Sequence, residues 1–174
     1  DPQLATHNVQ VAAEAAGAAF LFNADVREIR QSGGKVRGIT LANGDDIDAP
    51  VVVNVAGPHS AIVNEMAGVA DAMNIKTRAL RQEVVHIPAP EGFDYMSRGP
   101  VTSDSDIACY SRPETGNHIL FGSEDPECDG REWVDPDDYN TEFTEQWQTQ
   151  ALRAGQRVPD LKIPNQAKGV VSLY

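Results

Sequence analysis

The sequence predicts an α/β fold with an α+β part, in which a helix and a small β-meander precede an antiparallel sheet. Hairpin-type glycine turns at 33–34 and 43–44 join extended segments in the first third of the chain. A valine-rich run at 51–55 then precedes a glycine turn, as in strands buried on both faces. Beyond residue 75 the extended segments lengthen, which favours an antiparallel sheet.

The first predicted element is a helix over residues 2–16. Asp1 can accept hydrogen bonds from the free amides as an N-cap, and Pro2 fits the first helical position because it has no amide donor to leave unpaired. Gly17 supplies the usual left-handed stop. The apolar residues that recur near a 3.6-residue period are Leu4, Val11, Ala12, Ala15 and Ala16.

The meander follows, and its predicted extended segments are residues 19–22, 26–31, 35–41 and 46–55. The last of them is expected to be a strand buried on both faces, because four of its residues from 51 to 55 are valines. A sharp turn at Gly57 and Pro58 should then lead into a helix over residues 59–66.

The second half of the chain is predicted as an antiparallel sheet followed by a helix. Its extended segments are residues 75–87, 106–112 and 118–122. Asp135 and Pro136 repeat the opening cap, so a polar helix is expected from there to about Ala154. Phe143 and Trp147, four residues apart, should form its core-facing stripe.

Composition excludes several classes of protein. The 174 residues include 14 Lys and Arg against 26 Asp and Glu, for a net charge of −12, and no basic cluster that would neutralise nucleic-acid phosphates or bind a membrane surface. No apolar run approaches the roughly 20 residues of a membrane span. Two distant cysteines and no secretory leader favour a cytoplasmic protein. A first residue other than Met and a final strand without a tail suggest an interior piece of a longer chain.

The chain carries no recognisable catalytic machinery of its own. The histidines and cysteines lack metal-ligand spacing, and no Ser-His-Asp or Gly-x-Ser-x-Gly arrangement is present. Residues 125–130 begin like a calcium loop, but Pro136 occupies the position of the bidentate glutamate, so a solvated loop is expected. Any redox chemistry would therefore come from a bound cofactor.

The order of the segments resembles the D-amino-acid oxidase superfamily, in the branch that contains glycine oxidase, sarcosine oxidase and dimethylglycine dehydrogenase. The matching stretches are "AAEAAGA", "ADVREI", "KVRGITLANGDDIDAPVVVNVAGP", "RQEVVHIPAP", "CYSRPETGNHILFGSEDP" and "VPDLKIPNQAKGVVSLY". The family's GxGxxG fingerprint and its C-terminal glycine-rich segment are absent from these residues. Pro58 and His59 stand where many relatives carry a tryptophan, so no role of that indole transfers.

The resemblance implies an incomplete FAD-binding Rossmann-like domain over residues 1–70, an antiparallel-sheet substrate-binding domain over 71–164, and a strand at 165–174 that returns to the FAD-binding domain. It implies FAD as the cofactor. The Val26 backbone would pair with the adenine edge, and Ala56 and Gly57 would lie close to the flavin. The alternatives are a core valine at 26 and a ligand-free strand-to-helix turn at 56–57.

Strand alternation places Tyr110 and Arg112 on one face, where they could contact a substrate. An arginine fork binds a carboxylate through two parallel charge-assisted hydrogen bonds, as an amino-acid substrate requires. The alternative is an exposed arginine paired with one of the many acids. Arg81 is a second candidate for the same role.

The function implied by the resemblance is FAD-dependent oxidation of the C–N bond of a small amine or an (N-methyl) amino acid to an imine. Electrons would pass to oxygen, or to a carrier protein or quinone. A non-catalytic acidic α+β binding module and a flavoprotein of another reaction class remain as alternatives. We expect the isolated chain to hold little or no FAD and to be inactive, because the helix N-terminus that cradles the pyrophosphate is missing.

Overall fold

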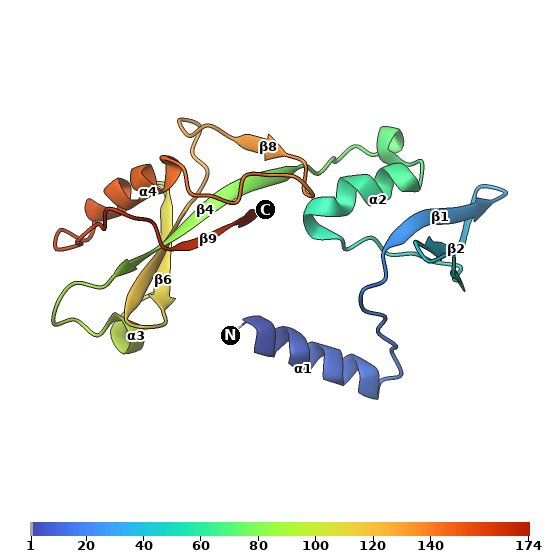
Figure 1. The fold of residues 1–174 in the computed structure, drawn as a ribbon, viewed down its shortest axis with the longest axis horizontal. Coiled ribbons are helices and arrows are strands. Elements are labelled where there is room, and N and C mark those ends of the chain that lie inside the picture. The colour runs from blue at the N-terminus through green and yellow to red at the C-terminus, as the bar shows by residue number, and fades with distance from the viewer. Residues whose placement is uncertain (1) are drawn as a thin grey trace. The chain divides into compact units, whose positions relative to one another are not determined.

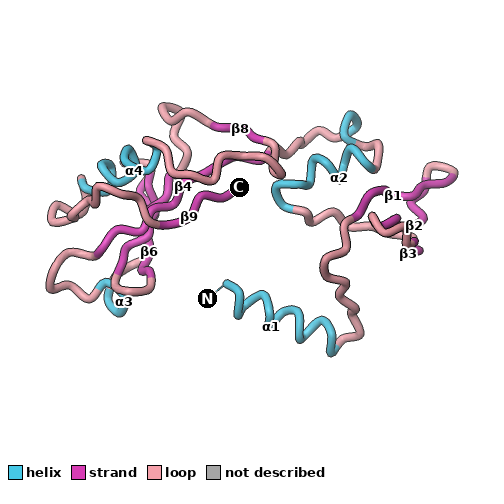
Figure 2. The backbone as a smooth tube through the Cα atoms, in the orientation of Figure 1, coloured by secondary structure: helices cyan, strands magenta, loops and turns pink. Residues whose placement is uncertain are grey.

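The computed structural model describes residues 2–174, which form two compact units (Figure 1). Of the described residues, unit 1 contains 2–54 and Val63–Ala72, and unit 2 contains Val55–Ile62 and Met73–Tyr174. Both units combine helical and extended segments (Figure 2). Within residues 2–174, all strand pairings are antiparallel. The predicted mixed α/β fold with antiparallel sheets is confirmed.

Unit 1 begins with helix α1, Pro2–Ala15, which confirms the first predicted element. Gly17 has a φ of +95°, and its N–H donates to the carbonyl of Glu14 at 2.9 Å, so it ends the helix as expected. Asp1, the predicted N-cap, lies outside the described residues. No residue of α1 is buried.

The meander of unit 1 is a three-stranded antiparallel sheet in the order β1-β2-β3. Its strands are Val26–Ser32, Lys35–Leu41 and Asp46–Asp48. Ile29, Ile39 and Ile47 lie in register across the three strands. Both glycine turns fall where the sequence predicts them, because left-handed backbone at 33, 34 and 44 favours glycine.

The prediction of a buried strand at 51–55 is wrong for this structure. These residues join no sheet within the described chain, and the side chains of Val51 and Val53 are 70% and 74% exposed. A strand buried on both faces requires neighbouring strands and covering helices, and residues 2–174 supply neither at this run. Residues 19–22 also form no strand, and Phe20 and Phe22 instead stack with ring centroids 6.1 Å apart.

Three short helical segments follow the valine run. They are η1, Gly57–His59; α2, Ser60–Met66; and η2, Ala70–Ala72. Helix α2 confirms the helix that the sequence predicts over residues 59–66, and η1 precedes it directly. Pro58 sits in the first turn of η1, where its missing N–H costs no hydrogen bond.

Unit 2 is built on a six-stranded antiparallel sheet. The strands are β4, Ala79–Pro88; β5, Thr102–Asp104; β6, Cys109–Glu114; β7, His118–Ser123; β8, Glu132–Val134; and β9, Gly169–Leu173. The order is β5-β6-β7-β4-β8, and β9 also pairs with β4. The predicted sheet is therefore confirmed.

The predicted strand at 106–112 starts too early. Residues 105–108 form a turn, in which Ala108 has a φ of +49° and the Asp104 carboxylate accepts the N–H of Asp106 at 3.1 Å. Aspartate commonly closes such a turn by bonding the backbone two residues ahead. The alternation predicted for Tyr110 and Arg112 still holds, because both lie on β6.

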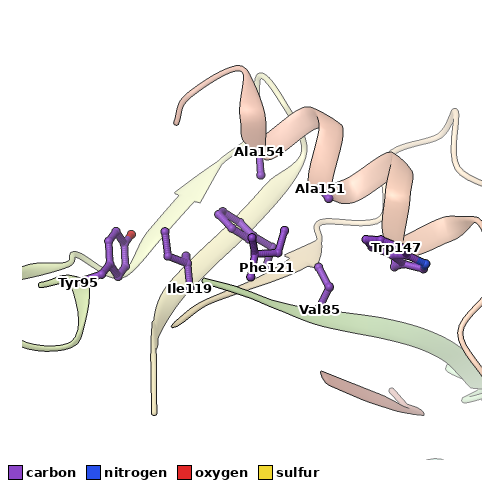
Figure 3. Packing of buried hydrophobic residues seen from close by; sticks show 8 residues of the cluster. Val85, Tyr95, Ile119, Phe121, Trp147, Ala151 and Ala154 are labelled. Atoms are coloured by element: carbon purple, nitrogen blue, oxygen red, sulfur yellow. The ribbon is translucent and has the colours of Figure 1, made fainter. Parts of the chain in front are cut away.

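Helices α3, Tyr95–Arg98, and α4, Gln146–Gly155, contact the strands of this sheet. In Figure 3, Ala151 and Ala154 point from α4 towards the sheet, and Trp147 lies at the other end of the helix. The core cluster comprises Val85, Ile87, Tyr95, Ile119, Phe121, Trp147, Ala151 and Ala154. Phe143 packs against this cluster from outside the helix, so the predicted Phe143–Trp147 stripe exists without a continuous helix.

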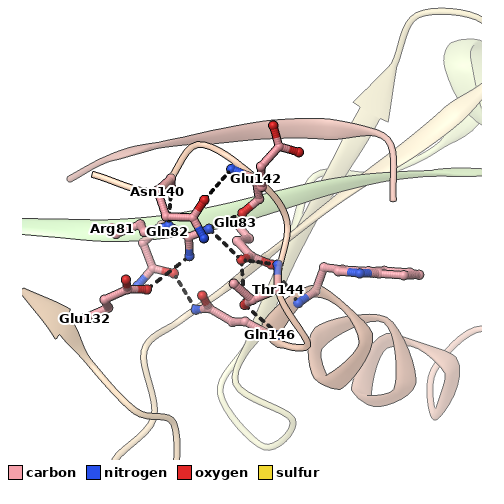
Figure 4. A network of polar contacts seen from close by, with 9 residues as sticks. Arg81, Gln82, Glu83, Glu132, Asn140, Glu142, Thr144 and Gln146 are labelled. Carbon is pink, nitrogen blue, oxygen red and sulfur yellow. Dashed lines mark hydrogen bonds and ion pairs between the residues drawn. The ribbon is translucent and has the colours of Figure 1, made fainter. Parts of the chain in front are cut away.

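Helix α4 begins at Gln146, so the prediction of a helix from Asp135 and Pro136 is wrong. The Asp135 carboxylate instead accepts the N–H of Asp137 at 2.9 Å and closes a turn. The segment before α4 is held by two fully buried side chains of β4, Arg81 and Glu83 (Figure 4). The local capping signal therefore yields to long-range polar contacts that the sequence alone does not display.

These contacts satisfy backbone groups at the start of α4. Glu83 accepts the N–H of Thr144 at 2.8 Å and the N–H of Trp147 at 3.0 Å, and it pairs with Arg81 at 2.9 Å. Arg81 in turn donates to the carbonyls of Asn140 at 2.6 Å and Glu142 at 2.5 Å. Glu83 thus serves as a helix cap from a distant strand.

Both cysteines are free, Cys109 buried and Cys128 exposed. No helix within the described part of the chain has the length and apolar character needed to cross a bilayer.

Candidate functional site

The sheet of unit 2 has two chemically different faces. One, which we call the helix face, carries Val85 and Phe121, which lie opposite each other on neighbouring strands and belong to the core with α4. Strand alternation sends Tyr110 and Arg112 to the other face. We call this second face the tyrosine face and define it by Tyr110, Arg112, His86, Leu120, Gly122 and Tyr174.

The register of the strands brings the residues of the tyrosine face side by side. Gly122 of β7 lies directly opposite Tyr110 of β6. Leu120 lies opposite Arg112 on one side and His86 of β4 on the other. The two sequence-predicted substrate residues are therefore neighbours on one surface, next to His86, a histidine without metal-ligand spacing in the sequence.

Tyr110 is fixed by a glycine and by a second tyrosine. A Cβ on Gly122 would lie 2.2 Å from Cζ of the Tyr110 ring, so the ring rests where any larger residue would collide with it. Its hydroxyl lies 2.5 Å from the hydroxyl of Tyr174. Burial, and then the contact with Tyr174, raise the pKa of Tyr110. The Tyr110 hydroxyl therefore stays protonated near neutral pH. One proton bridges the two oxygens, and the pair has a second O–H that can be donated to a ligand.

Arg112 is half-exposed and uses only part of its guanidinium. Its Nη1 contacts Oε2 of Glu114 at 2.9 Å and the carbonyl of Pro113 at 3.0 Å. Arg112 therefore forms an ion pair with Glu114, as the alternative of an exposed arginine paired with an acid predicts. Within residues 2–174, Nε and Nη2 of Arg112 contact no acceptor. This free edge has the two parallel donors that match a carboxylate.

Glu114 is held in its ionised form beside Arg112. The backbone N–H of Thr115 is the main cause that lowers the pKa of the Glu114 carboxyl, and Arg112 lowers it further. The Glu114 carboxylate accepts that N–H at 2.8 Å and the Thr115 hydroxyl at 3.0 Å. Glu114 thus holds the guanidinium of Arg112 through Nη1 and, within the described chain, leaves Nε and Nη2 free.

His86 was missed as a functional candidate. Its Nε2 is buried and has no hydrogen-bond partner among the residues that the structure describes. Burial is the main cause that lowers the pKa of His86; Glu114 opposes this shift, and Arg112 and His118 add to it. The ring is therefore neutral near pH 7. His86 lies opposite Leu120, and this pairing places it on the tyrosine face. The sequence could reveal that position only if the register of β4 and β7 were known.

The predicted cofactor residues fall in different units. Val26 begins β1 in unit 1, is partly buried and pairs with Leu41. Ala56 and Gly57 lie in unit 2, and the carbonyl of Ala56 accepts the N–H of His59 at 3.1 Å. Their joint cofactor site therefore stays a prediction.

The backbone at Gly57 fits the close approach of a flat group. Its φ of +57° lies in the left-handed region, and a Cβ there would meet no atom within 4 Å. The space that a side chain would fill is open, so a ring system can approach the main chain. The segment also packs on the sheet of unit 2, because η1 contacts β4.

Arg81 is not available to a substrate. Its side chain is 1% exposed, and its donors contact the carbonyls of Asn140 and Glu142 and two glutamates. The second candidate from the sequence is therefore wrong. No group of three or more His, Cys, Asp or Glu among residues 2–174 is placed to hold a metal ion.

The sequence of residues 1–171 matches the DAO family, described as FAD dependent oxidoreductase. The chain belongs to this family. The resemblance predicted from the ordered motifs is thereby confirmed, and FAD is the cofactor on which the family depends. A search among curated proteins finds no match.

Two solved structures are similar to this chain. L-proline dehydrogenase from P. horikoshii matches with a TM-score of 0.74 and 19% identity, over 100% of this chain and 43% of that chain. Glycine oxidase from Bacillus cereus ATCC 14579 matches with a TM-score of 0.49 and 15% identity, over 86% of this chain and 37% of that one. The DAO-family chain thus spans less than half the length of either structure.

Proposed function

We propose that this DAO-family protein oxidises the C–N bond of a small amine or an (N-methyl) amino acid to an imine. The observation that carries the proposal is the donor edge of Arg112 that is free among residues 2–174, formed by Nε and Nη2, beside the Tyr110–Tyr174 pair and on a face that α4 does not cover. When bound, FAD would supply the redox chemistry by accepting a hydride from the substrate carbon.

The residues of the tyrosine face would recognise the substrate. Nε and Nη2 of Arg112 would donate to the two oxygens of a carboxylate, while Glu114 keeps the guanidinium in place through Nη1. The free hydroxyl proton of the Tyr110–Tyr174 pair would donate to the same carboxylate. With its carboxylate held, the substrate would have fewer orientations available for its reacting C–H bond.

Val26, Ala56 and Gly57 are the residues that we propose for FAD. Val26 would offer extended backbone to the adenine edge, and the open side of Gly57 would allow the isoalloxazine to come close. In the same proposal, residues 1–70 belong to an FAD-binding domain that other chain segments complete, and residues 71–164 form the substrate-binding domain. Residues 165–174 include β9, which pairs with β4, and would return towards the FAD-binding domain.

The test is anaerobic titration of the full-length, FAD-loaded protein with a panel of amines, while the flavin absorbance is recorded. The panel contains glycine, sarcosine, dimethylglycine and L-proline, the last because an L-proline dehydrogenase shares the fold. Each is paired with its analogue lacking the carboxylate, such as pyrrolidine for proline. We expect at least one amino acid to bleach the flavin absorbance, and its analogue to need at least about tenfold more ligand, the loss of about 1.4 kcal/mol of binding.

A flavin that no amine reduces would contradict the proposal and favour a flavoprotein of another reaction class. If reduction occurs, readmission of oxygen identifies the electron acceptor. Stoichiometric hydrogen peroxide indicates an oxidase, and slow reoxidation that a quinone or carrier protein accelerates indicates a dehydrogenase.

A further inference from the structure

The helix face of unit 2 contains a cavity that the proposed oxidation does not use. It has a volume of about 320 Å³ and lies between β5, β6 and the C-terminal end of α4. Its apolar walls come from Tyr95, Pro100, Ile107, Phe121, Ala154 and Val158. In Figure 3, Ala154 lies at the end of α4 nearer Tyr95, and Trp147 lies at the opposite end. Tyr110 contributes to both the cavity and the tyrosine face.

The cavity is larger than a packing defect. An apolar cavity of about 150 Å³ already admits a benzene ring, and ligand sites in proteins begin at about 300 Å³. The alanine at position 154, 1% exposed, leaves room that a larger residue would fill. The space is therefore sufficient for one substituted aromatic ring.

One polar feature of the cavity can orient a ligand. The Ser111 hydroxyl is buried and lies 2.6 Å from the Thr102 hydroxyl. The pair has two protons and uses one between them, so one O–H remains for a hydrogen-bond acceptor. Cys109 also lines the cavity, and burial raises the pKa of its thiol, which keeps it neutral.

The charges at the cavity are already paired. Arg157 contacts Asp104 through Nε at 2.6 Å and lies 3.6 Å from a carboxylate oxygen of Asp106. Arg157 lowers the pKa of Asp104, and Asp104 raises the pKa of Arg157, so both stay ionised near neutral pH. A charged ligand would have to break this pair, whereas a neutral ligand leaves it intact.

We propose that this cavity, defined by its apolar walls and the Thr102–Ser111 hydroxyl pair, is a second ligand site for a neutral, ring-sized molecule with one hydrogen-bond acceptor. The acceptor would receive the free hydroxyl proton, and the ring would lie between Phe121 and the end of α4. The site does not depend on the proposed amine oxidation, because, among the described residues, neither Arg112 nor Tyr174 lines the cavity and Tyr110 is the one lining residue that it shares with the tyrosine face.

Binding is tested by saturation-transfer NMR on the full-length FAD-loaded protein with three probes. Acetophenone is neutral with one acceptor, ethylbenzene lacks the acceptor, and benzylammonium is charged and lacks the carboxylate that Arg112 would bind. We expect saturable binding that is strongest for acetophenone, then ethylbenzene, and weakest for benzylammonium. No saturable binding of either neutral probe, or tighter binding of benzylammonium, would overturn the proposal.

Three variants distinguish the site from other surfaces. Ser111→Ala should weaken acetophenone about fivefold, as expected for one lost hydrogen bond, and leave ethylbenzene unchanged. Val158→Phe, at a partly exposed wall position, should weaken both neutral probes by filling the space. Arg112→Lys, on the tyrosine face, should affect neither. Unchanged binding in Val158→Phe, or loss of binding in Arg112→Lys, would place the probes elsewhere and overturn the proposal.

Discussion

The two units of the chain bury their apolar residues to very different extents. In unit 2, Val85, Ile87 and Ile119 are completely buried between the sheet and α4. In unit 1, Ile29 and Leu41 are the buried apolar residues among those described, while Val51 and Val53 are largely exposed. Unit 2 thus has a core made from its own residues, whereas the elements of unit 1 form with little burial.

This difference in burial reflects the interactions that form each unit. Helix α1 and the β1–β2 hairpin follow local signals, namely Pro2, Gly17 and the glycine turn at 33–34. The sheet of unit 2 depends on packing between residues far apart in sequence, and burial of apolar surface is the main stabilising term in folding. Substitutions should therefore act strongly in unit 2 and weakly in the exposed segments of unit 1.

The largest expected effect comes from Glu83. Glu83→Gln leaves Arg81 without its buried counter-ion and replaces the carboxylate that accepts the N–H groups at the start of α4 by an amide. We expect the free energy of unfolding of unit 2 to fall by about 3–5 kcal/mol, as when one partner of a buried pair is removed. Both tryptophans lie in unit 2, so tryptophan fluorescence during urea unfolding reports on this unit alone.

The control is Glu91→Gln, which alters an exposed pair with Lys162 and should give no measurable change. A Glu83→Gln protein as stable as the parent would show that the buried network contributes nothing, and the contrast between the units would lose its main support.

A pair of truncations compares the units directly. Ile119→Ala creates a cavity in the core of unit 2 and should lower its free energy of unfolding by about 2–5 kcal/mol. Val53→Ala removes exposed apolar surface and should change stability by less than about 0.5 kcal/mol. Urea unfolding followed by circular dichroism measures both. Equal losses would mean that residues 51–55 are buried in solution, against the structure.

Gly122→Ala tests the packing of Tyr110 on the tyrosine face. The added methyl collides with the ring, so Tyr110 must move and lose its contact with Tyr174. We expect a loss of about 1–3 kcal/mol, typical of overpacking. Tyrosine absorbance during alkaline titration provides the specific readout, because a displaced Tyr110 should ionise at lower pH. Gly130→Ala, whose Cβ would meet nothing within 4 Å, is the control.

The smallest effect concerns pH. Burial raises the pKa of Tyr110 in the folded state above its ordinary value of about 10, so the folded protein retains a proton that the unfolded chain loses. The resulting stability is fully present below pH 10 and is lost as pH rises through the folded-state pKa. Tyr110→Phe should cost about 1 kcal/mol at pH 7 and flatten this alkaline decline, measured by urea unfolding from pH 8 to 11. If Tyr110→Phe leaves the alkaline decline in the free energy of unfolding unchanged, a raised pKa of Tyr110 is not its cause.

Much of the fold could be predicted from local patterns. The hairpin was predicted because glycine is required where the backbone is left-handed, and α1 because Pro2 and Gly17 mark its ends. The start of α4 could not be predicted, since Glu83, more than sixty residues away in sequence, supplies its cap. The valine run suggested a strand, but strand formation depends on a partner, which a single run of residues does not reveal.

The candidate site was predictable to the extent that it depends on alternation along one strand. Tyr110 and Arg112 share a face because they are two residues apart on β6. Tyr174, Gly122 and His86 reach the same face only through strand register, so the sequence gives no sign of their proximity. Arg81 had the right chemistry in the sequence, and only its burial excludes it.

Arg112 provides the most direct test of the proposed carboxylate recognition. Arg112→Lys keeps the charge but removes the parallel pair of donors, and Arg27→Lys, at an exposed pair with Asp25, is the matched control. The measurement is KM for the best amino acid and for its analogue without the carboxylate, in the parent and in both variants. We predict that Arg112→Lys raises KM for the amino acid at least about tenfold and leaves KM for the analogue unchanged. Equal changes for both substrates, or none, would contradict recognition of the carboxylate by Arg112.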